Sequence, residues 1–158
     1  MVSMTRFQKR VLLAASGSAA LMLGALAFQY IGGYAPCKMC FWQRWPHGLA
    51  MALFLLVIVL PKRVFALLGA VLMVVSAGLG LYHAGVEQKW WEGPTSCTGS
   101  GLSVSDNLLD FSEPVKLVLC DEIVWDLFGI TMAGYNAIIS VVLVVLWLRA
   151  YASSSASQ

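Results

Sequence analysis

Residues 64–82 read VFALLGAVLMVVSAGLGLY, a segment without a single charged side chain. This length approaches the span of about 20 apolar residues that an α-helix needs to cross the hydrocarbon core of a bilayer. Three further uncharged apolar stretches occupy residues 11–31, 45–60 and 133–148. Over the whole chain 59% of the residues are hydrophobic and 11% are charged, whereas soluble domains carry roughly 25% charged residues. The sequence therefore predicts an all-α, polytopic membrane protein.

We expect a single membrane domain over residues 1–151, built as a bundle of four transmembrane helices. The predicted spans are about 11–31, 42–60, 64–82 and 133–151. The second span reaches full length only if its helix begins before the apolar run, near residues 37–44. The first span follows basic residues, as in a signal peptide. Its apolar run exceeds the roughly 7 to 15 residues of such a peptide, so we expect the span to remain in the protein.

Basic residues predict the orientation of the bundle. With a cytoplasmic N-terminus, six of the ten basic residues fall in short cytoplasmic segments, namely Arg6, Lys9, Arg10, Lys62, Arg63 and Arg149. All eight acidic residues then lie in one long external loop. This topology gives external loops at about residues 32–41 and 83–132. Residues 152–158 would form a disordered cytoplasmic tail.

All four cysteines lie in the two predicted external loops, at Cys37, Cys40, Cys97 and Cys120. Thiols that served only as small apolar residues would be scattered through the helices. Their segregation favours an oxidising compartment and either redox or metal chemistry. Four cysteines allow three pairings, among which the sequence does not choose.

The segment PCKMC, residues 36–40, places two thiols three positions apart, where they can close a disulfide at or just before a helix N-terminus. The positive end of the helix dipole then stabilises a thiolate. Pro46 supports a helix start nearby, because proline is tolerated in a first turn. Arg44 follows Cys40 by one helical turn and adds a permanent charge. We predict that Arg44 stabilises a thiolate or the negative oxygen of a reduced quinone, and snorkelling to the headgroups is the alternative.

Aromatic and imidazole side chains near the motif are weaker candidates. Phe41, Trp42 and Trp45 are placed to pack against a flat ring, although tryptophans at a membrane interface commonly form a belt. His83 follows the third apolar stretch and can donate a hydrogen bond to a quinone carbonyl, with a structural role as the alternative. His47 has no motif around it, and we interpret it as a packing residue.

Cys97 and Cys120 lie in the long loop, which contains Gly-Pro and Gly-Ser-Gly turn signals. They form either a structural staple or, coupled to the Cys-x-x-Cys pair, the second dithiol of a relay that exchanges through mixed disulfides. We favour the relay. Within the same loop, residues 104–119 suit a short helix at the membrane interface, although Pro114 interrupts its periodicity.

The sequence resembles the bacterial disulfide-bond-formation protein B (DsbB) family over nearly its whole length. The most specific segment is PCKMCFWQRWP, residues 36–46, which is similar to the family's Cys-x-x-Cys-x-x-x-Arg signature. Further similar segments are Tyr82-His83, residues 94–97, and Cys120 followed by residues 125–132. The departures are Gln43, where some members carry an acid, and a shorter loop between the last two cysteines.

The resemblance implies a quinone-dependent thiol:disulfide oxidoreductase in a bacterial inner membrane, with its active-site loops periplasmic and both termini cytoplasmic. Such an enzyme reoxidises a periplasmic thioredoxin-fold protein, DsbA-like, and passes the electrons to ubiquinone or menaquinone. We expect neither a metal nor a nucleic-acid partner.

The resemblance also implies roles for individual residues. Cys97 would be attacked by the partner's thiol, and Cys120 would exchange with Cys37. Cys40 would face the quinone as a thiolate stabilised by Arg44, and Arg44 would also hold the quinone. The remaining residues implied to lie close to the ring are His83 and Met132.

Three alternatives are weaker. A relative of vitamin K epoxide reductase would share the bundle and the quinone chemistry, but that group usually carries its Cys-x-x-Cys late in the chain. A four-cysteine zinc site would favour a second Cys-x-x-Cys over two separated cysteines. A non-catalytic membrane protein with structural disulfides is the third alternative, and the effect of thiol blocking on activity would separate it from an enzyme.

Overall fold

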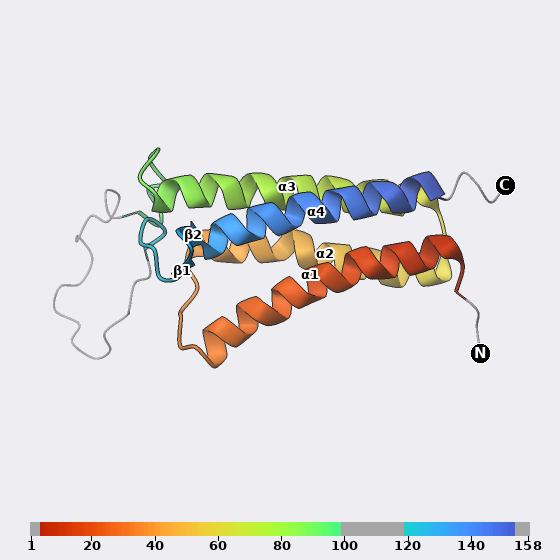
Figure 1. Ribbon diagram of the computed structural model, residues 1–158, viewed down its shortest axis with the longest axis horizontal. Helices are drawn as coiled ribbons and strands as arrows, with labels where there is room; N and C mark the ends of the chain where they lie inside the picture. Colours follow the sequence, from red (N-terminus) through yellow and green to blue (C-terminus); the bar gives the residue numbers. More distant parts are fainter. Residues whose placement is uncertain (1–3, 99–118, 154–158) are drawn as a thin grey trace.

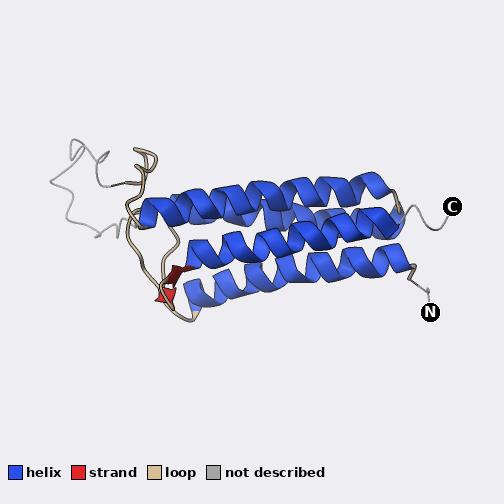
Figure 2. Ribbon diagram, turned by 45° about the horizontal axis from the view of Figure 1, so that its top comes forward, coloured by secondary structure: helices blue, strands red, loops and turns tan. Residues whose placement is uncertain are grey.

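The computed structural model describes residues 4–98 and 119–153. Four long helices run side by side as an elongated bundle (Figures 1 and 2), α1 (Arg6–Tyr30), α2 (Lys38–Val59), α3 (Arg63–Glu87) and α4 (Met132–Ser153). The principal contacts join α1 to α2, α2 to α3, α3 to α4 and α4 to α1, so the helices close into a ring. The predicted helical bundle is therefore confirmed.

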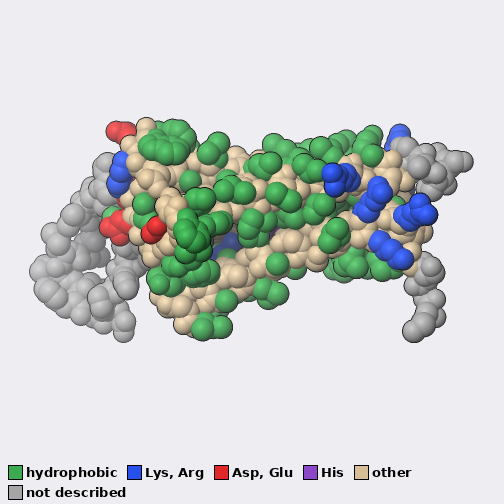
Figure 3. Space-filling view, viewed as in Figure 1, with side chains coloured by type: hydrophobic (Ala, Val, Ile, Leu, Met, Phe, Trp, Pro, Cys, Tyr) green, Lys and Arg blue, Asp and Glu red, His purple; other side chains and the backbone are tan. Residues whose placement is uncertain are grey.

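The surface of the bundle suits a membrane. Helices α1, α3 and α4 are long and apolar enough to cross one, with mean hydropathies of 2.0, 2.4 and 1.7 over their most apolar windows. Helix α2 is more polar in its first half, where it carries Gln43, Arg44 and His47. Hydrophobic side chains cover the middle of the visible face, and most visible basic side chains gather at the end that holds both termini (Figure 3). The loops that contain the cysteines lie at the opposite end (Figure 1).

Helix α1 packs most tightly against the bundle in its first half. A capping box between Thr5 and Gln8 starts the helix. Its buried side chains all lie between Phe7 and Ser18. The second half diverges from the other helices toward the loop end of the molecule (Figure 1). This divergence leaves room beside α2 and α4 near the cysteines.

Helix α2 begins at the Cys-x-x-Cys motif itself. The Cys37 thiol is its N-cap and accepts a hydrogen bond from the backbone N–H of Cys40 at 3.2 Å. The helix therefore starts four residues before the predicted span, and Pro46 lies in its interior rather than in its first turn. The prediction that Pro46 lies in the first turn of the helix was wrong. Pro46 has no backbone N–H, so the Trp42 carbonyl lacks its usual hydrogen-bond partner within the helix. Helices packed among others in a membrane tolerate such a loss.

Helix α3 continues past the predicted end of its span, from residue 82 to Glu87. His83 and Glu87 consequently lie on the last turns of a helix and not in a loop. At the other end of α3, the fully buried Trp147 ring packs on Gly69, where an added Cβ would overlap it. A glycine is required there because the indole of α4 approaches the α3 backbone directly.

A two-residue hairpin precedes α4. Strands β1 (Asp126–Leu127) and β2 (Ile130–Thr131) pair in antiparallel register, with Asp126 opposite Thr131. Phe128 and Gly129 both have positive φ, 54° and 77°, as the tight turn of such a hairpin requires. The sequence had indicated only irregular structure here. The possible interfacial helix lies almost wholly outside the described residues, as does most of the predicted tail.

Candidate active site

Cys37 and Cys40 form a pair of free thiols whose sulfurs lie 2.7 Å apart. Cys37 is buried and Cys40 is partly exposed. The pKa of Cys37 is raised well above the ordinary thiol value, first by its hydrogen bond to the Cys40 sulfur, then by burial and by the charge on Cys40. This raised pKa favours the neutral thiol form of Cys37.

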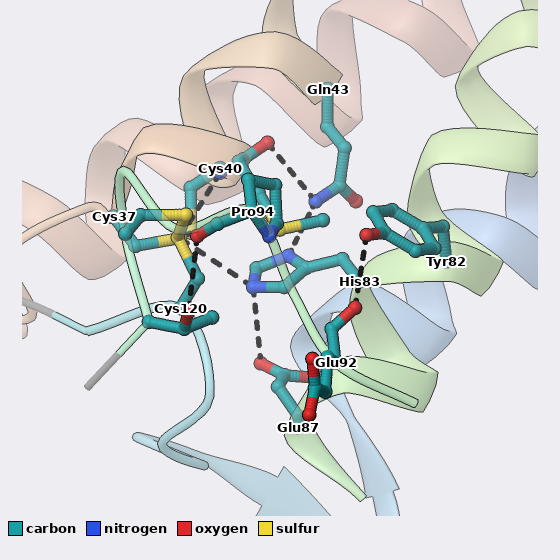
Figure 4. The surroundings of a disulfide bond; sticks show 12 residues. Cys37, Cys40, Gln43, Tyr82, His83, Glu87, Glu92, Pro94 and Cys120 are labelled. Carbon is teal, nitrogen blue, oxygen red and sulfur yellow. Dashed lines mark hydrogen bonds and ion pairs between the residues drawn. A yellow bond between two sulfur atoms is a disulfide. The ribbon is translucent and has the colours of Figure 1, made fainter. Parts of the chain in front are cut away.

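Cys97 and Cys120 are joined by a disulfide, with Cα atoms 5.3 Å apart. Both are buried, and they share one cluster with Cys37, Met39 and Val86, against which Cys40 packs. Figure 4 shows Cys37, Cys40 and Cys120 close together beside His83 of α3. The fold thus brings together two dithiols that are distant in the sequence, one oxidised and one reduced.

His83 reaches this pair from α3. Its Nε2 atom lies 3.5 Å from the Cys37 sulfur, and its Nδ1 atom lies 2.7 Å from Nε2 of Gln43 (Figure 4). Glu87 follows one turn later, with Oε1 3.8 Å from the same His83 Nε2 atom, and its carboxyl also hydrogen-bonds Thr131. The sequence interpretation missed Glu87 because it assigned residues after 82 to the loop.

Arg44 points toward α1 rather than toward the thiols. Its guanidinium donates hydrogen bonds to Oε1 of Gln29 at 2.6 Å and to the Ala25 carbonyl at 3.4 Å. It also lies over the Phe41 ring, 5.1 Å from the centroid. Within the described part of the chain no hydrogen bond joins Arg44 to a sulfur, so its charge acts on Cys40 through space.

A cavity of about 530 Å³ opens beside the dithiol, between the diverging half of α1, helices α2 and α4, and the hairpin. Such a volume is typical of small-molecule sites. Four residues that the sequence predicted as quinone contacts line it, namely Cys40, Arg44, His83 and Met132. The rest of the wall is mainly apolar, with Leu21, Phe28 and Ile139 among its side chains. The cavity therefore suits a flat, apolar ligand that meets a thiol and a positive charge.

Other polar side chains of the wall were not predicted. Gln43, Asn136 and Tyr135 line the cavity. So does His47, which we had interpreted as packing and which is hydrogen-bonded at both ring nitrogens, to Ser18 and Asn136. No local motif marks these residues, because their partners lie on other helices. Trp42 and Trp45 are exposed and do not line the cavity, as the aromatic-belt alternative expects.

The ligand atoms of Cys37, Cys40 and His83 all lie within 4.8 Å of one another, close enough to hold a soft metal ion. The alternative of a four-cysteine zinc site requires Cys97 and Cys120 as thiolates as well. In this structure the two are bonded to each other.

Sequence comparison identifies the family. Residues 8–150 match the family described as "Disulfide bond formation protein DsbB". The chain belongs to the DsbB family. A DsbB relative, the disulfide bond formation protein B of Marinobacter nauticus, is 28% identical over 140 residues, which cover 82% of this chain and 83% of that protein. No solved structure matches the chain.

Membership in the DsbB family confirms the class predicted from the sequence, a helical membrane protein of disulfide bond formation. The family implies that the chain is a thiol oxidoreductase. Family membership favours DsbB over the two alternatives, a relative of vitamin K epoxide reductase and a merely structural membrane protein.

Proposed function

We propose that this DsbB protein oxidises a soluble dithiol partner and passes the two electrons to a membrane quinone. One observation supports this most directly. The free thiol Cys40 lines the same apolar cavity as Arg44, His83 and Met132, while Cys97 and Cys120 do not line it and share a buried cluster with Cys37. Electrons can enter at one dithiol and leave at the other.

The cavity residues fit a quinone. A bound quinone supplies a two-electron, two-proton acceptor in contact with apolar walls. Cys40 would present its sulfur to the ring, and Arg44 would stabilise negative charge both on that sulfur and on the ring oxygens. His83 and Met132 would complete the contacts. Whether the acceptor is ubiquinone or menaquinone depends on the quinone of the membrane.

The other dithiol would serve the partner. Cys97 retains 6% exposure and Cys120 none, so Cys97 is the sulfur that a partner's thiolate can attack. Attack forms a mixed disulfide and releases Cys120 as a thiolate. Cys120 then attacks the Cys37 sulfur once the Cys37–Cys40 disulfide has formed, and the partner's second thiol releases the oxidised partner. Cys97, freed as a thiolate, then attacks Cys120 and releases Cys37, so the Cys97–Cys120 disulfide forms again. Each exchange breaks one disulfide and forms another, and in sum the partner's two thiols become a disulfide while Cys37 and Cys40 become the thiols that hold the two electrons.

The partner's location follows from the proposed orientation. We propose that both termini face the cytoplasm of a bacterial cell and that the cysteine loops face the periplasm. The clustering of basic side chains at the terminal end of the bundle supports this (Figure 3). The partner is then a periplasmic, DsbA-like thioredoxin-fold protein.

The proposal is tested by anaerobic mixing of the purified protein with a reduced thioredoxin-fold oxidase and a soluble quinone. We expect quinone absorbance to fall in step with disulfide formation in the partner, one quinone per disulfide. The matched control is the Cys40→Ser protein, which should leave the quinone oxidised. Disulfide formation without loss of quinone would contradict the proposal.

A further inference from the structure

A line of hydrogen bonds crosses the bundle from its centre to the dithiol. It begins at His47 on α2, passes to Asn136 on α4 at 2.9 Å, and continues to Gln43 on α2 at 2.8 Å. Gln43 then contacts His83 on α3 at 2.7 Å, and His83 lies 3.5 Å from the Cys37 sulfur. His47, Gln43 and His83 are all buried. We call this line the polar line. Each of its internal members has a partner on another helix.

The donor-to-acceptor direction of the hydrogen bonds along the polar line is fixed first at Gln43. The Gln43 amide group that touches His83 also lies 3.3 Å from the backbone carbonyl of Met39. A carbonyl oxygen only accepts, so the Gln43 atom facing it must be the NH₂ nitrogen. The same nitrogen faces Nδ1 of His83, and it can only donate there. The Nδ1 atom of His83 is consequently an acceptor without a proton.

The direction is fixed a second time at Asn136. Its side-chain nitrogen lies 3.4 Å from the backbone carbonyl of Ser76, so this atom too must be the NH₂ group. The same group donates to the free oxygen of the Gln43 amide. The Asn136 oxygen then faces Nε2 of His47, which must carry a proton in order to donate. Two independent carbonyls therefore give the polar line one and the same direction.

This direction decides which ring nitrogen of His83 carries the proton. Because its Nδ1 accepts from Gln43, the neutral imidazole carries its proton on Nε2, the atom that faces the Cys37 sulfur. The backbone of Cys120 also hydrogen-bonds this ring. The Cys37 sulfur lies 2.7 Å from the Cys40 sulfur and donates to it when Cys40 is a thiolate, so in that state every donor from His47 onward points toward Cys40. Hydrogen bonds aligned in one direction polarise one another in a buried site.

We propose that Gln43 and Asn136 are positioning residues that hold His83 as its Nε2–H tautomer, so that the polar line stabilises negative charge on the cavity-facing sulfur of Cys40. The inference deepens the proposed function and rests on it for its purpose. Its structural content, the tautomer of His83, does not depend on which molecule accepts the electrons.

The tautomer can be read by ¹⁵N NMR of protein labelled at histidine in lipid nanodiscs, because the chain has only two histidines. A His47→Gln protein assigns the remaining signals to His83. We expect the wild-type His83 to be protonated at Nε2 and bare at Nδ1. Wild-type protein with the proton on Nδ1 would overturn the proposal at once.

Two variants test the positioning role. Gln43→Glu places a carboxylate, which only accepts, against Nδ1, so the proton should move onto Nδ1 or both nitrogens should become protonated. Asn136→Leu removes the donor to the Gln43 oxygen, and we expect a mixture of the two tautomers. Tyr82→Phe is the matched control: it removes a hydroxyl that neighbours His83 in the sequence and donates to the Glu92 carbonyl, outside the polar line. Its spectrum should equal that of the wild type.

A second readout follows the charge on Cys40. Asn136→Leu should slow alkylation of Cys40 at neutral pH by about three- to tenfold, the usual effect of losing one hydrogen bond between uncharged groups, while Tyr82→Phe should not. If Gln43→Glu and Asn136→Leu both leave the tautomer and the alkylation rate unchanged, the positioning role is refuted. If the wild type has the expected tautomer but reduces no quinone, the proposed function fails and the tautomer assignment stands.

Discussion

Arg44 brings a permanent positive charge to the edge of an apolar cavity, and its planar group is held by Gln29 and the Ala25 carbonyl. We predict that Arg44→Ala raises the apparent KM for quinone by one to two orders of magnitude, as loss of about 1.5 to 3 kcal/mol from a charge-assisted contact implies. Arg44→Lys should give an intermediate apparent KM for quinone, because lysine keeps the positive charge but lacks the planar guanidinium with its paired donors. Steady-state quinone titrations measure both.

The matched control is Lys38→Ala, which removes an exposed positive charge from the same first turns of α2. It should change the quinone KM little. An Arg44→Ala protein with unchanged quinone kinetics but poor folding would indicate that Arg44 anchors α1 and α2 and does not act on the ligand.

The two thiols of the Cys-x-x-Cys pair should differ in reactivity. Because the hydrogen bond to Cys40 and burial raise the pKa of Cys37, Cys37 carries almost no thiolate at neutral pH and iodoacetamide should modify Cys40 first. In a Cys40→Ser protein the first cause of the raised pKa is gone, and Cys37 should become reactive closer to the ordinary thiol pKa of about 8.5. Mass spectrometry across a pH series measures both rates. Faster labelling of Cys37 than of Cys40 in the wild type would be the opposite result.

Individual residues were predictable from the sequence where a local pattern marks them. The spacing of Cys37, Cys40 and Arg44 is visible within eight positions of sequence. The polar line has no such signature, because Asn136 reaches Gln43 across 93 positions and contacts two other helices at one level of the bundle. Such a cluster becomes visible only when the packing of the helices is known.

Among the elements, α3 and α4 pack closely where the Trp147 ring lies on Gly69. We predict that Gly69→Val displaces the buried Trp147 ring and destabilises the protein by about 1–3 kcal/mol, as overpacking a buried site does. Gly78→Ala is the matched control in the same helix, because a Cβ there meets nothing within 4 Å. Reversible unfolding in mixed micelles compares the two. Equal stability of both variants would show that the indole can move aside at no cost.

The existence of the helices followed from their apolar runs, but their ends did not. Helix α2 starts at a cysteine cap and α3 runs on to Glu87, since both ends are set by polar groups that pair inside the bundle rather than by hydropathy. The hairpin before α4 was missed because only its turn residues mark it, and its strands are two residues long.

For the whole molecule, orientation is the first test. We predict that single-cysteine variants retaining Cys37, Cys40, Cys97 or Cys120 react with a membrane-impermeant maleimide in intact spheroplasts, because the basic end of the bundle should stay in the cytoplasm. Where burial slows labelling, the extent of labelling in spheroplasts and in inside-out vesicles is compared with the extent in the same sample after brief detergent treatment, which admits the reagent to both sides. Labelling of Cys97 only in inside-out vesicles would reverse the topology.

The division of labour between the two dithiols is the second test. A protein carrying Cys97→Ser and Cys120→Ser should fail to oxidise the soluble partner, yet its Cys37 and Cys40 should still reduce quinone when a small thiol recycles them. The two reactions should separate because Cys40 lines the cavity, whereas Cys97 and Cys120 do not line it and pack against Cys37. Wild-type partner oxidation by this variant would show that Cys97 and Cys120 only staple the loop.

The diverging half of α1 has a consequence for how such an enzyme meets its oxidant. Its residues from Gly17 to Phe28 form one wall of the cavity, so the ligand site adjoins the acyl chains of the surrounding lipid. An oily carrier would arrive by lateral diffusion in two dimensions and would never need to enter water. The concentration that governs turnover would then be the mole fraction of carrier in the bilayer. Adding plain lipid to a reconstituted sample, at constant total quinone, should slow the enzyme as a competitive inhibitor would.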